Sequence, residues 1–293
     1  MSVRGRRFTL GAAYAATALI LAFLTAIAFF PYKALEKRME RAFLERTGAS
    51  LRLMETGYSP PFGLGADRAV VSRNGAEELA VELAGIDVQW RPWALFWGEQ
   101  RFVGEARTCG GRLKTVLRFD SFLFGDSGAG SLELKNISLK ECAGALQPGR
   151  LPNLSGKLEG KASVRNLLHG LRGMSGNASL SVEDARAGFD AGVLKGLAIQ
   201  DAGFRGSLRK KGDTLQVSET QLRSPGIEVS LSGEIRLKEK LEQSALDLRT
   251  ELEFHPGRLA GQPENPLVGE AMARKRLELA LGGTLAGPRI RRK

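Results

Sequence analysis

The sequence predicts a mainly β protein in which an N-terminal transmembrane helix and an amphipathic helix precede a long curled antiparallel sheet. Three observations support this: an uncharged stretch near the N-terminus, a helical period directly after it, and an apolar period of two over most of the remaining chain. About ten strands are expected, with almost no helix to cover them. The sheet must therefore cover its own apolar face by closing as a barrel, stacking as a sandwich or curling into a groove.

Composition limits the classes of protein that fit. The chain has 293 residues, 43% apolar and 26% charged, with two Cys, which excludes a collagen, a fully disordered chain and a disulfide-dense mini-protein. The net charge of +11 comes mostly from the two ends of the chain, because residues 8–270 hold 33 basic and 31 acidic side chains. Nucleic-acid binding needs basic side chains gathered on one surface, so we expect no nucleic-acid partner.

The predicted anchor is the segment 8–30, which contains no charged residue. As a helix its 23 residues would rise about 35 Å, enough to cross a hydrocarbon layer of roughly 30 Å. A cleaved secretory signal is the alternative, since Ala26–Ala28 has the A-x-A form, but its apolar region would normally be shorter. We expect residues 1–7 to be a cytoplasmic tail and the bulk of the chain to lie in the periplasm of a bacterium, which makes this a single-pass inner-membrane protein.

Residues 31–48 are predicted to form an amphipathic helix. Leu35, Met39, Ala42 and Phe43 recur at helical spacing, and Gly48 supplies a stop. Such a helix either lies at the bilayer interface or packs against one end of the following domain.

Residues 49–286 are predicted to be a periplasmic β-rich domain, because apolar and polar residues alternate there. The alternation is longest from Ile227 to Lys238, and it places every apolar group on one face of a strand. Two strands change phase, at Ala84–Gly85 and at Asn136, as β-bulges would require. The other alternating stretches are Leu113–Phe119, Leu132–Leu139, Leu154–Val164, Ala178–Val182, Leu246–Phe254 and Leu277–Leu285.

The connections between these strands carry turn residues. Lys211-Gly-Asp, Ser224-Pro-Gly and Gly287-Pro are expected to be turns of a meander of hairpins. Only Asn166–Arg172 and Gly257–Met272 could be helical within the domain. The last residues, 287–293, are expected to be a basic C-terminal tail.

No catalytic or cofactor site is predicted. Gly125–Gly128 reads Gly-Asp-Ser-Gly, like a trypsin-type nucleophile segment, but His169 and His255 both follow Ser127, whereas that family places its His before the Ser. Two His at unrelated positions do not form a metal site. We therefore expect no metal, no cofactor and no enzymatic activity.

The two cysteines, Cys109 and Cys142, are candidates for a disulfide. If the strands before and after Gly125–Asp126 form a hairpin, Cys142 lies opposite Cys109. A periplasmic location would allow the bond to form. The alternative is two small buried residues with free thiols.

All three tryptophans lie in the segment Trp90–Trp97, where Pro92 ends a strand and an apolar turn follows. This segment is either a knob that binds an interface or a partner, or a loop folded over the end of the sheet.

Four further features of the sequence together resemble a known protein family. They are the Pro31–Gly48 segment after the anchor, repeats of the form apolar-x-Gly-x-apolar-x-apolar, the Arg91-Pro92 break followed by Cys109–Gly111, and the closing Leu281–Pro288. Over nearly the whole chain this pattern resembles the type II secretion system protein GspN family, in the form that is similar to AsmA-like envelope proteins. The resemblance implies a long curled sheet, an AsmA-like groove or half-barrel, with partners among the inner membrane and other type II secretion components.

Three functions are consistent with these features. The first is an accessory, non-enzymatic component of type II secretion. The second is an AsmA-like lipid-binding or lipid-transfer protein that holds a phospholipid or another acyl lipid in an apolar groove. The third is a structural scaffold with a closed interior. The residues predicted to line the groove are Leu231, Ile235, Leu248, Leu252 and Leu281.

Overall fold

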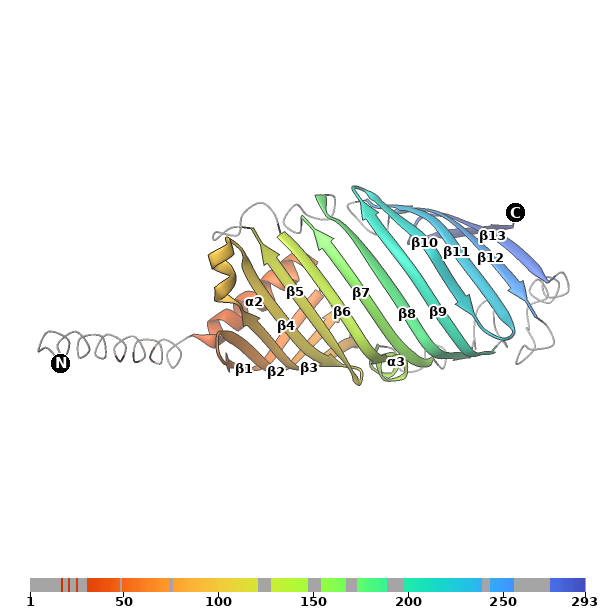
Figure 1. The fold of residues 1–293 in the computed structure, drawn as a ribbon. Coiled ribbons are helices and arrows are strands. Elements are labelled where there is room, and N and C mark those ends of the chain that lie inside the picture. The colour runs from red at the N-terminus through yellow and green to blue at the C-terminus, as the bar shows by residue number, and fades with distance from the viewer. Residues whose placement is uncertain are drawn as a thin grey trace, which may run out of the picture.

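The fold is known from a computed structural model (Figure 1). It describes residues 31–47, 49–73, 76–120, 128–146, 154–166, 173–188, 198–238, 243–255 and 275–292 and, within the expected anchor, only Thr17, Leu21 and Thr25. Among these residues no helix is both long and apolar enough to cross a bilayer. The predicted anchor at 8–30 otherwise lies outside the described residues, as do most of the possible helices at 166–172 and 257–272.

The described chain begins with helix α2 (Tyr32–Thr47), as the sequence predicts. It packs against the first strand, β1 (Ala49–Ser59), through two carboxylates. The backbone N–H of Leu53 donates to Glu40 Oε1 at 2.9 Å, and the Thr56 hydroxyl donates to Glu36 Oε2 at 2.9 Å. Helix α2 therefore covers backbone at an edge of the sheet that would otherwise be free to pair.

Fourteen strands of the described residues make one antiparallel sheet. This confirms the predicted mainly β fold with a long antiparallel sheet after a helix, and it exceeds the ten or so strands expected. Short helices lie between some of the described strands: the 3-10 helix η1 (Pro92–Trp97) follows β3, and α3 (Leu139–Leu146) follows β6. After β1 the strands are β2 (Gly63–Arg73), β3 (Ala76–Trp90), β4 (Gln100–Thr108), β5 (Gly111–Phe119), β6 (Gly128–Ser138), β7 (Ser155–Arg165), β8 (Ser175–Gly188), β9 (Ala198–Lys211), β10 (Thr214–Arg223), β11 (Ile227–Arg236), β12 (Ala245–Phe254), β13 (Arg276–Gly283) and β14 (Pro288–Arg292).

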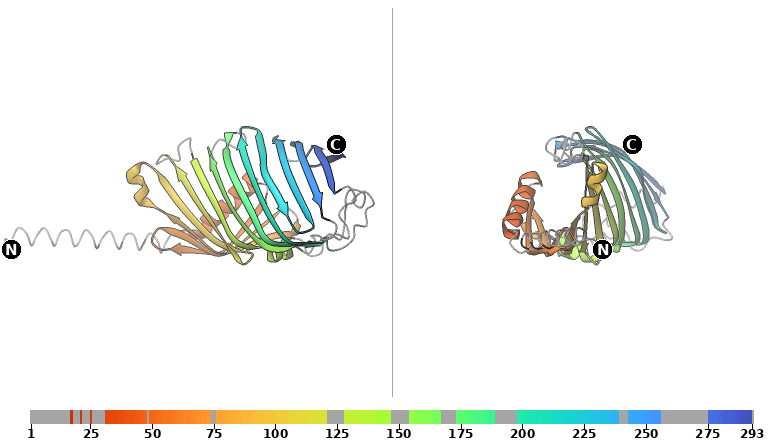
Figure 2. Two further views of the ribbon diagram at one scale, coloured as in Figure 1. Left: turned by 45° about the vertical axis from the view of Figure 1, so that its right-hand side comes forward. Right: turned by 60° about the vertical axis from the view of Figure 1, so that its left-hand side comes forward.

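The order of strands in space is the order along the chain, so that β1 and β14 are the two edges. Each strand pairs only with its sequence neighbours, as expected for a meander of hairpins. The sheet is strongly curled, and Figure 2 shows it wrapping around a common axis with its edges apart. It is therefore one open sheet, neither a stack of two sheets nor a sheet closed by pairing between β1 and β14.

Both predicted β-bulges are confirmed. The β3–β4 register shifts between Ala84 and Asp87, where Gly85 has φ 58°, and the β6–β7 register shifts between Leu134 and Ile137, where Asn136 has φ 53°. The extra residue returns the apolar side chains to the same face after each bend. The turns predicted at 211–213, 224–226 and 287–288 also join consecutive strands.

Two expectations about strand ends are wrong. Leu139 begins α3 instead of extending the strand that ends at Ser138, because the Ser138 hydroxyl accepts from the Glu141 N–H at 3.3 Å and caps the helix. Residues 288–292 are the edge strand β14 instead of a basic tail, with Ile290 opposite Leu281. The β domain therefore extends beyond 286.

Candidate functional site: the apolar face of the sheet

One face of the sheet is apolar from the first edge to the last. In the register of the strands, most apolar residues lie beside an apolar residue or a glycine in the next strand, as in the row Leu113, Leu134, Gly160 and Leu180. The same holds at both edges, where Leu53 pairs with Ala69 and Leu281 with Ile290. Threonines take some of the other places on this face, beside Leu132, Leu231 and Leu279. Side chains alternate between the two faces of a strand. The apolar face is therefore continuous only if each bulge returns the apolar side chains to the same face.

The five residues predicted to line a groove all lie on this face. Leu248 pairs with Leu281, and Leu252 is next to Val229. Leu248 and Leu252 are buried at 9% and 8% exposure, while the other three, Leu231, Ile235 and Leu281, are half-buried. The structure therefore brings the predicted set together on three adjacent strands.

Most of the apolar face is only half-buried. Among the described residues, packed clusters of buried side chains form around Leu53 and Ala69 near the first edge and around Val182 and Ala202 on β8 and β9. Between them, Leu117, Leu132 and similar side chains keep intermediate exposure. In a closed core such residues would be buried by a second layer. The described residues provide no second layer over most of this face.

Glycines on the apolar face make room for their neighbours. A Cβ added at Gly160 would lie 2.7 Å from Leu180 Cδ2, and one at Gly104 would lie 2.7 Å from Thr115 Cγ2. At Gly233, which has φ 138°, a Cβ would lie 2.2 Å from the Asp247 carbonyl oxygen. The repeated apolar-x-Gly-x-apolar pattern in the sequence thus places small residues beside large ones across strands.

Helix α3 packs on one end of this face. Its Leu139 contacts the buried cluster of Val182, Ala185 and Ala202, and the helix touches both β3 and β7, which are separated by three strands in the sheet. A helix of eight residues is only about 12 Å long. It reaches both strands because the sheet bends toward the face on which the helix lies, so the apolar face is the concave one.

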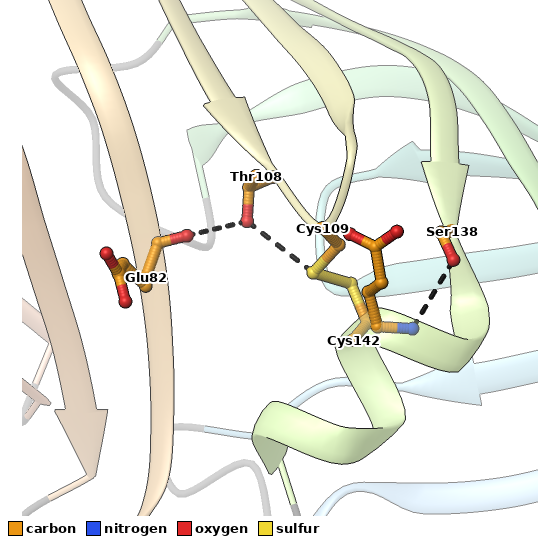
Figure 3. The surroundings of a disulfide bond; sticks show 6 residues. Glu82, Thr108, Cys109, Ser138 and Cys142 are labelled. Atoms are coloured by element: carbon orange, nitrogen blue, oxygen red, sulfur yellow. Dashed lines mark hydrogen bonds between the residues drawn. A yellow bond between two sulfur atoms is a disulfide. The ribbon is translucent and has the colours of Figure 1, made fainter.

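A disulfide holds α3 in this position. Cys109 and Cys142 are bonded, with their Cα atoms 5.2 Å apart (Figure 3). The Ser138 N–H also donates to the Cys109 carbonyl oxygen at 2.9 Å. The predicted hairpin register is wrong by four residues, since Cys109 lies beside Ser138 and not opposite Cys142. The helical turn after Ser138 brings Cys142 back to Cys109.

The turn that carries Cys109 is tight. Cys109 and Gly110 connect β4 to β5 with φ 46° and 71°, and Thr108 pairs with Gly111, as in a two-residue hairpin of the I′ type. The Thr108 hydroxyl donates to the Glu82 carbonyl oxygen at 2.8 Å. A Cβ at Gly111 would lie 2.6 Å from the Asn136 carbonyl oxygen. Residues Thr108–Gly111 therefore contact β3 through Thr108, α3 through Cys109 and β6 through Gly111.

The opposite, convex face is polar and carries ion pairs between neighbouring strands. Arg68 and Glu82 approach to 2.8 Å, as do Lys114 and Glu105. Glu133 lies between Lys135 and Lys161. The hydrogen bond from Lys135, together with the charges of both lysines, lowers the pKa of its carboxyl against the opposing effect of desolvation. Exposed pairs of this kind contribute little to stability, and they make this a solvated surface.

A third feature lies beside the sheet at η1. Trp93, Phe96 and Trp97 are 62%, 82% and 78% exposed, although Trp93 also contacts Phe62 edge-on with ring centroids 6.5 Å apart. A hollow of about 630 Å³ separates η1 from β4 and β5, with Arg91, Arg101 and Lys114 in its lining. The predicted aromatic segment is thus a short helix that projects from the sheet.

No cluster of three or more His, Cys, Asp or Glu side chains suited to a metal ion occurs among the described residues. His255 is exposed at the end of β12, whereas Ser127 and His169 lie outside the described residues. In the described part of the chain, the apolar face and the η1 corner are therefore the features to explain.

Comparison with known proteins adds no relative: no protein-family model, no curated protein and no solved structure matches this chain.

Proposed function

We propose that this protein binds the acyl chains of a lipid along the concave apolar face of its sheet, as a membrane-anchored lipid-binding or lipid-transfer protein of the bacterial envelope. The observation that carries the proposal is the continuous apolar face, half-buried over most of its length and without a second layer in the described residues. Exposing such a face to water is unfavourable in free energy, and an acyl chain bound on it would gain about 0.8 kcal/mol for each methylene group buried.

The shape of the sheet supports an elongated apolar ligand. The rows of leucine and glycine run across many strands, at about 4.8 Å per strand, so an acyl chain laid across them would contact several strands at once. We propose that the curled sheet forms an AsmA-like groove, with α3 closing part of one end. The packed clusters at the first edge and on β8 and β9 would limit the groove there.

The anchor expected at 8–30 would keep this groove at the surface of the inner membrane, with the sheet in the periplasm. The disulfide between Cys109 and Cys142 fits that compartment, because disulfides persist where thiols are oxidised. A membrane-anchored groove would exchange lipid with the bilayer that holds it.

Photo-crosslinking tests the groove with two adjacent positions of β11. Leu231 lies on the apolar face and is half-buried, whereas Ser232 lies on the polar face and is exposed. A p-benzoyl-phenylalanine at 231 in the full-length protein in cells is expected to form adducts with lipid that are detected by mass spectrometry. The same group at 232 is the matched control. Equal lipid adducts at both positions, or none at 231, would refute the groove.

Charge insertion gives a second measurement. Leu231→Glu should remove co-purifying lipid from the detergent-extracted protein, because an acyl chain would have to desolvate the carboxylate, while Ser232→Glu should leave it unchanged. Circular dichroism and an intact disulfide show that each variant is folded. If both variants retain the same lipid as the wild type, the apolar face is not the binding site.

We also propose, from the family resemblance, an accessory role in type II secretion. The motifs that carry this proposal are the Pro31–Gly48 segment, Arg91-Pro92 with Cys109–Gly111, and Leu281–Pro288. Its test is a genomic neighbourhood with secretion ATPase and pseudopilin genes, followed by a deletion strain. Normal export of type II substrates without this protein would remove the proposal.

A further inference from the structure

We infer that the η1 corner, defined as Arg91, Trp93, Phe96, Trp97 and Arg101, docks onto the anionic surface of the bilayer in which this chain is anchored. This goes beyond lipid binding in the groove and does not depend on it. The inference rests on three observations: the exposed aromatic side chains, the cations beside them, and the place of the corner relative to the expected anchor.

The aromatic side chains of η1 are held in place while remaining exposed. The helix is closed at both ends by backbone hydrogen bonds, from Arg91 N–H to the Arg101 carbonyl oxygen at 2.8 Å and from Gly98 N–H to the Leu95 carbonyl oxygen at 3.0 Å. Phe62 supports it from the β1–β2 connection by edge contacts with Trp90 and Trp93. Phe96 and Trp97 are nonetheless about four-fifths exposed. An ordered aromatic cluster that remains exposed to water indicates a site of interaction with another surface.

The residue types fit the interfacial zone of a bilayer. Tryptophan is enriched at the level of the lipid headgroups, because its ring has an apolar body and a polar N–H. Arg91 is exposed next to the aromatic side chains. Arg101 lines the hollow below η1, and its Nε is buried without a hydrogen-bond partner in the described structure. A lipid phosphate would accept two parallel hydrogen bonds from the exposed guanidinium of Arg91, a geometry that suits phosphate. Arg101 adds positive charge to the hollow, which Glu99 also lines.

The position of the corner supplies the third argument. Two views of the ribbon place the gold coil of η1 at the same end of the molecule as the N-terminal end of α2 (Figures 1 and 2). Helix α2 starts at Tyr32, directly after the 23 uncharged residues of 8–30. A chain leaving the bilayer at residue 30 therefore enters the molecule at the end where η1 projects. Anchor and η1 would make two contacts with one membrane and orient the sheet on it.

Fluorescence quenching by brominated lipid tests this directly. The full-length protein is reconstituted into vesicles of phosphatidylcholine and phosphatidylglycerol, with or without brominated acyl chains, and insertion is checked by flotation. We expect the wild type to be quenched about twofold more than the W93F/W97F variant, which retains only Trp90, because indoles at the headgroup level lie within reach of the upper acyl chains.

The matched control moves an indole to the far end of the sheet. Leu285 is 45% exposed in the β13–β14 connection, so Leu285→Trp in the W93F/W97F background adds an exposed tryptophan away from η1. We expect no added quenching there. Equal quenching of this variant and the wild type, or failure of the protein to float with vesicles, would overturn the proposal. If neither the wild type nor the Leu285→Trp variant is quenched, the proposal is also overturned, and a protein partner for the aromatic cluster is favoured.

Charge is tested separately from the aromatic contact. Replacing the anionic lipid by neutral phosphatidylcholine, or introducing Arg91→Glu, should reduce the quenching of the wild-type tryptophans, because the guanidinium attraction is lost or reversed. If quenching is the same in anionic and neutral vesicles and unaffected by Arg91→Glu, the anionic surface is not the ligand of this corner.

Discussion

The two edges of the sheet are protected in different ways. At β1 the protection is tertiary, because α2 lies along the strand, Glu40 accepts from the Leu53 N–H, and Leu53 and Ala69 are buried beneath. At β14 the protection lies in the strand itself, which has five residues, begins with a proline and contains three arginines. Short, basic or proline-containing strands resist pairing with other chains. An open sheet can thus resist pairing with other chains without closing, if each edge is made unsuitable for pairing.

This comparison has energetic consequences. The β1 side carries α2, a buried cluster and, further along, the disulfide that fixes α3. In its described residues the β12–β14 side has no helix packed on it. Leu248, Leu252 and Phe254 of β12 are buried, but no described side chain of β13 or β14 is. We therefore expect damage on the β1 side to cost more stability than equivalent damage on the β14 side, and the following variants test this from the largest effect to the smallest.

Removing the disulfide should have the largest effect. Cys109→Ser with Cys142→Ser opens a covalent loop with a sequence separation of 33, which the chain-entropy model values at about 3–4 kcal/mol. Urea unfolding of the full-length protein in detergent, followed by circular dichroism, measures the loss. A loss below about 1 kcal/mol would mean that α3 is held by its apolar contacts instead.

Leu53→Ala should be the next most damaging. Leu53 is 7% exposed within a small cluster, and leucine-to-alanine changes in cores cost about 2–5 kcal/mol, so we expect about 2–3. Leu281→Ala, on the same face but half-buried beside β14, should cost about half as much. The same urea titration compares the two, and equal losses would contradict the proposed difference between the edges.

Glu40→Ala tests the covering of β1 by α2. It leaves the Leu53 N–H without its partner, which should cost about 1 kcal/mol. Amide hydrogen exchange should show faster exchange at Leu53 in the variant. Glu45→Ala, at an exposed position of α2, is the control and should leave the exchange at Leu53 unchanged.

The smallest effect on stability is expected at β14. Arg289→Thr with Arg291→Val removes charge from the edge strand, and exposed substitutions change stability by about 0.5 kcal/mol or less. The expected result is self-association, measured by light scattering after size-exclusion chromatography, because the edge becomes able to pair. A variant with the same molar mass in solution as the wild type would show that the arginines do not protect this edge.

The alternation of side chains was enough to predict the sheet and its apolar face. Leu231, Ile235, Leu248, Leu252 and Leu281 share one face because side chains alternate with a period of two in any extended strand. The phase changes at Gly85 and Asn136 were predictable for the same reason, since an apolar pattern that shifts by one residue requires a bulge. The alternation and the bulges depend on residues that are close in sequence, so they can be predicted from the sequence directly.

Other features depended on contacts that a local pattern does not contain. Leu139 fits a strand pattern but starts α3, because Ser138 caps a helix that is also tied to Cys109. The basic residues 288–292 have the composition of a tail and become β14 only because β13 offers them a free edge. The exposure of Trp97 also depends on tertiary contacts. Phe62 packs against Trp93, and the Arg101 carbonyl oxygen accepts from the Arg91 N–H, which together fix the position of η1.

Local sequence patterns were sufficient to predict which side chains share a face of the sheet, where the strands bend and turn, and that a helix precedes them. The open edges of the sheet, the concavity of its apolar face and the attachment of α3 at one end of that face became visible only in the folded molecule. The physical reason is that alternation specifies a face for each side chain, whereas curvature is the sum of twist, bulges and packing over fourteen strands.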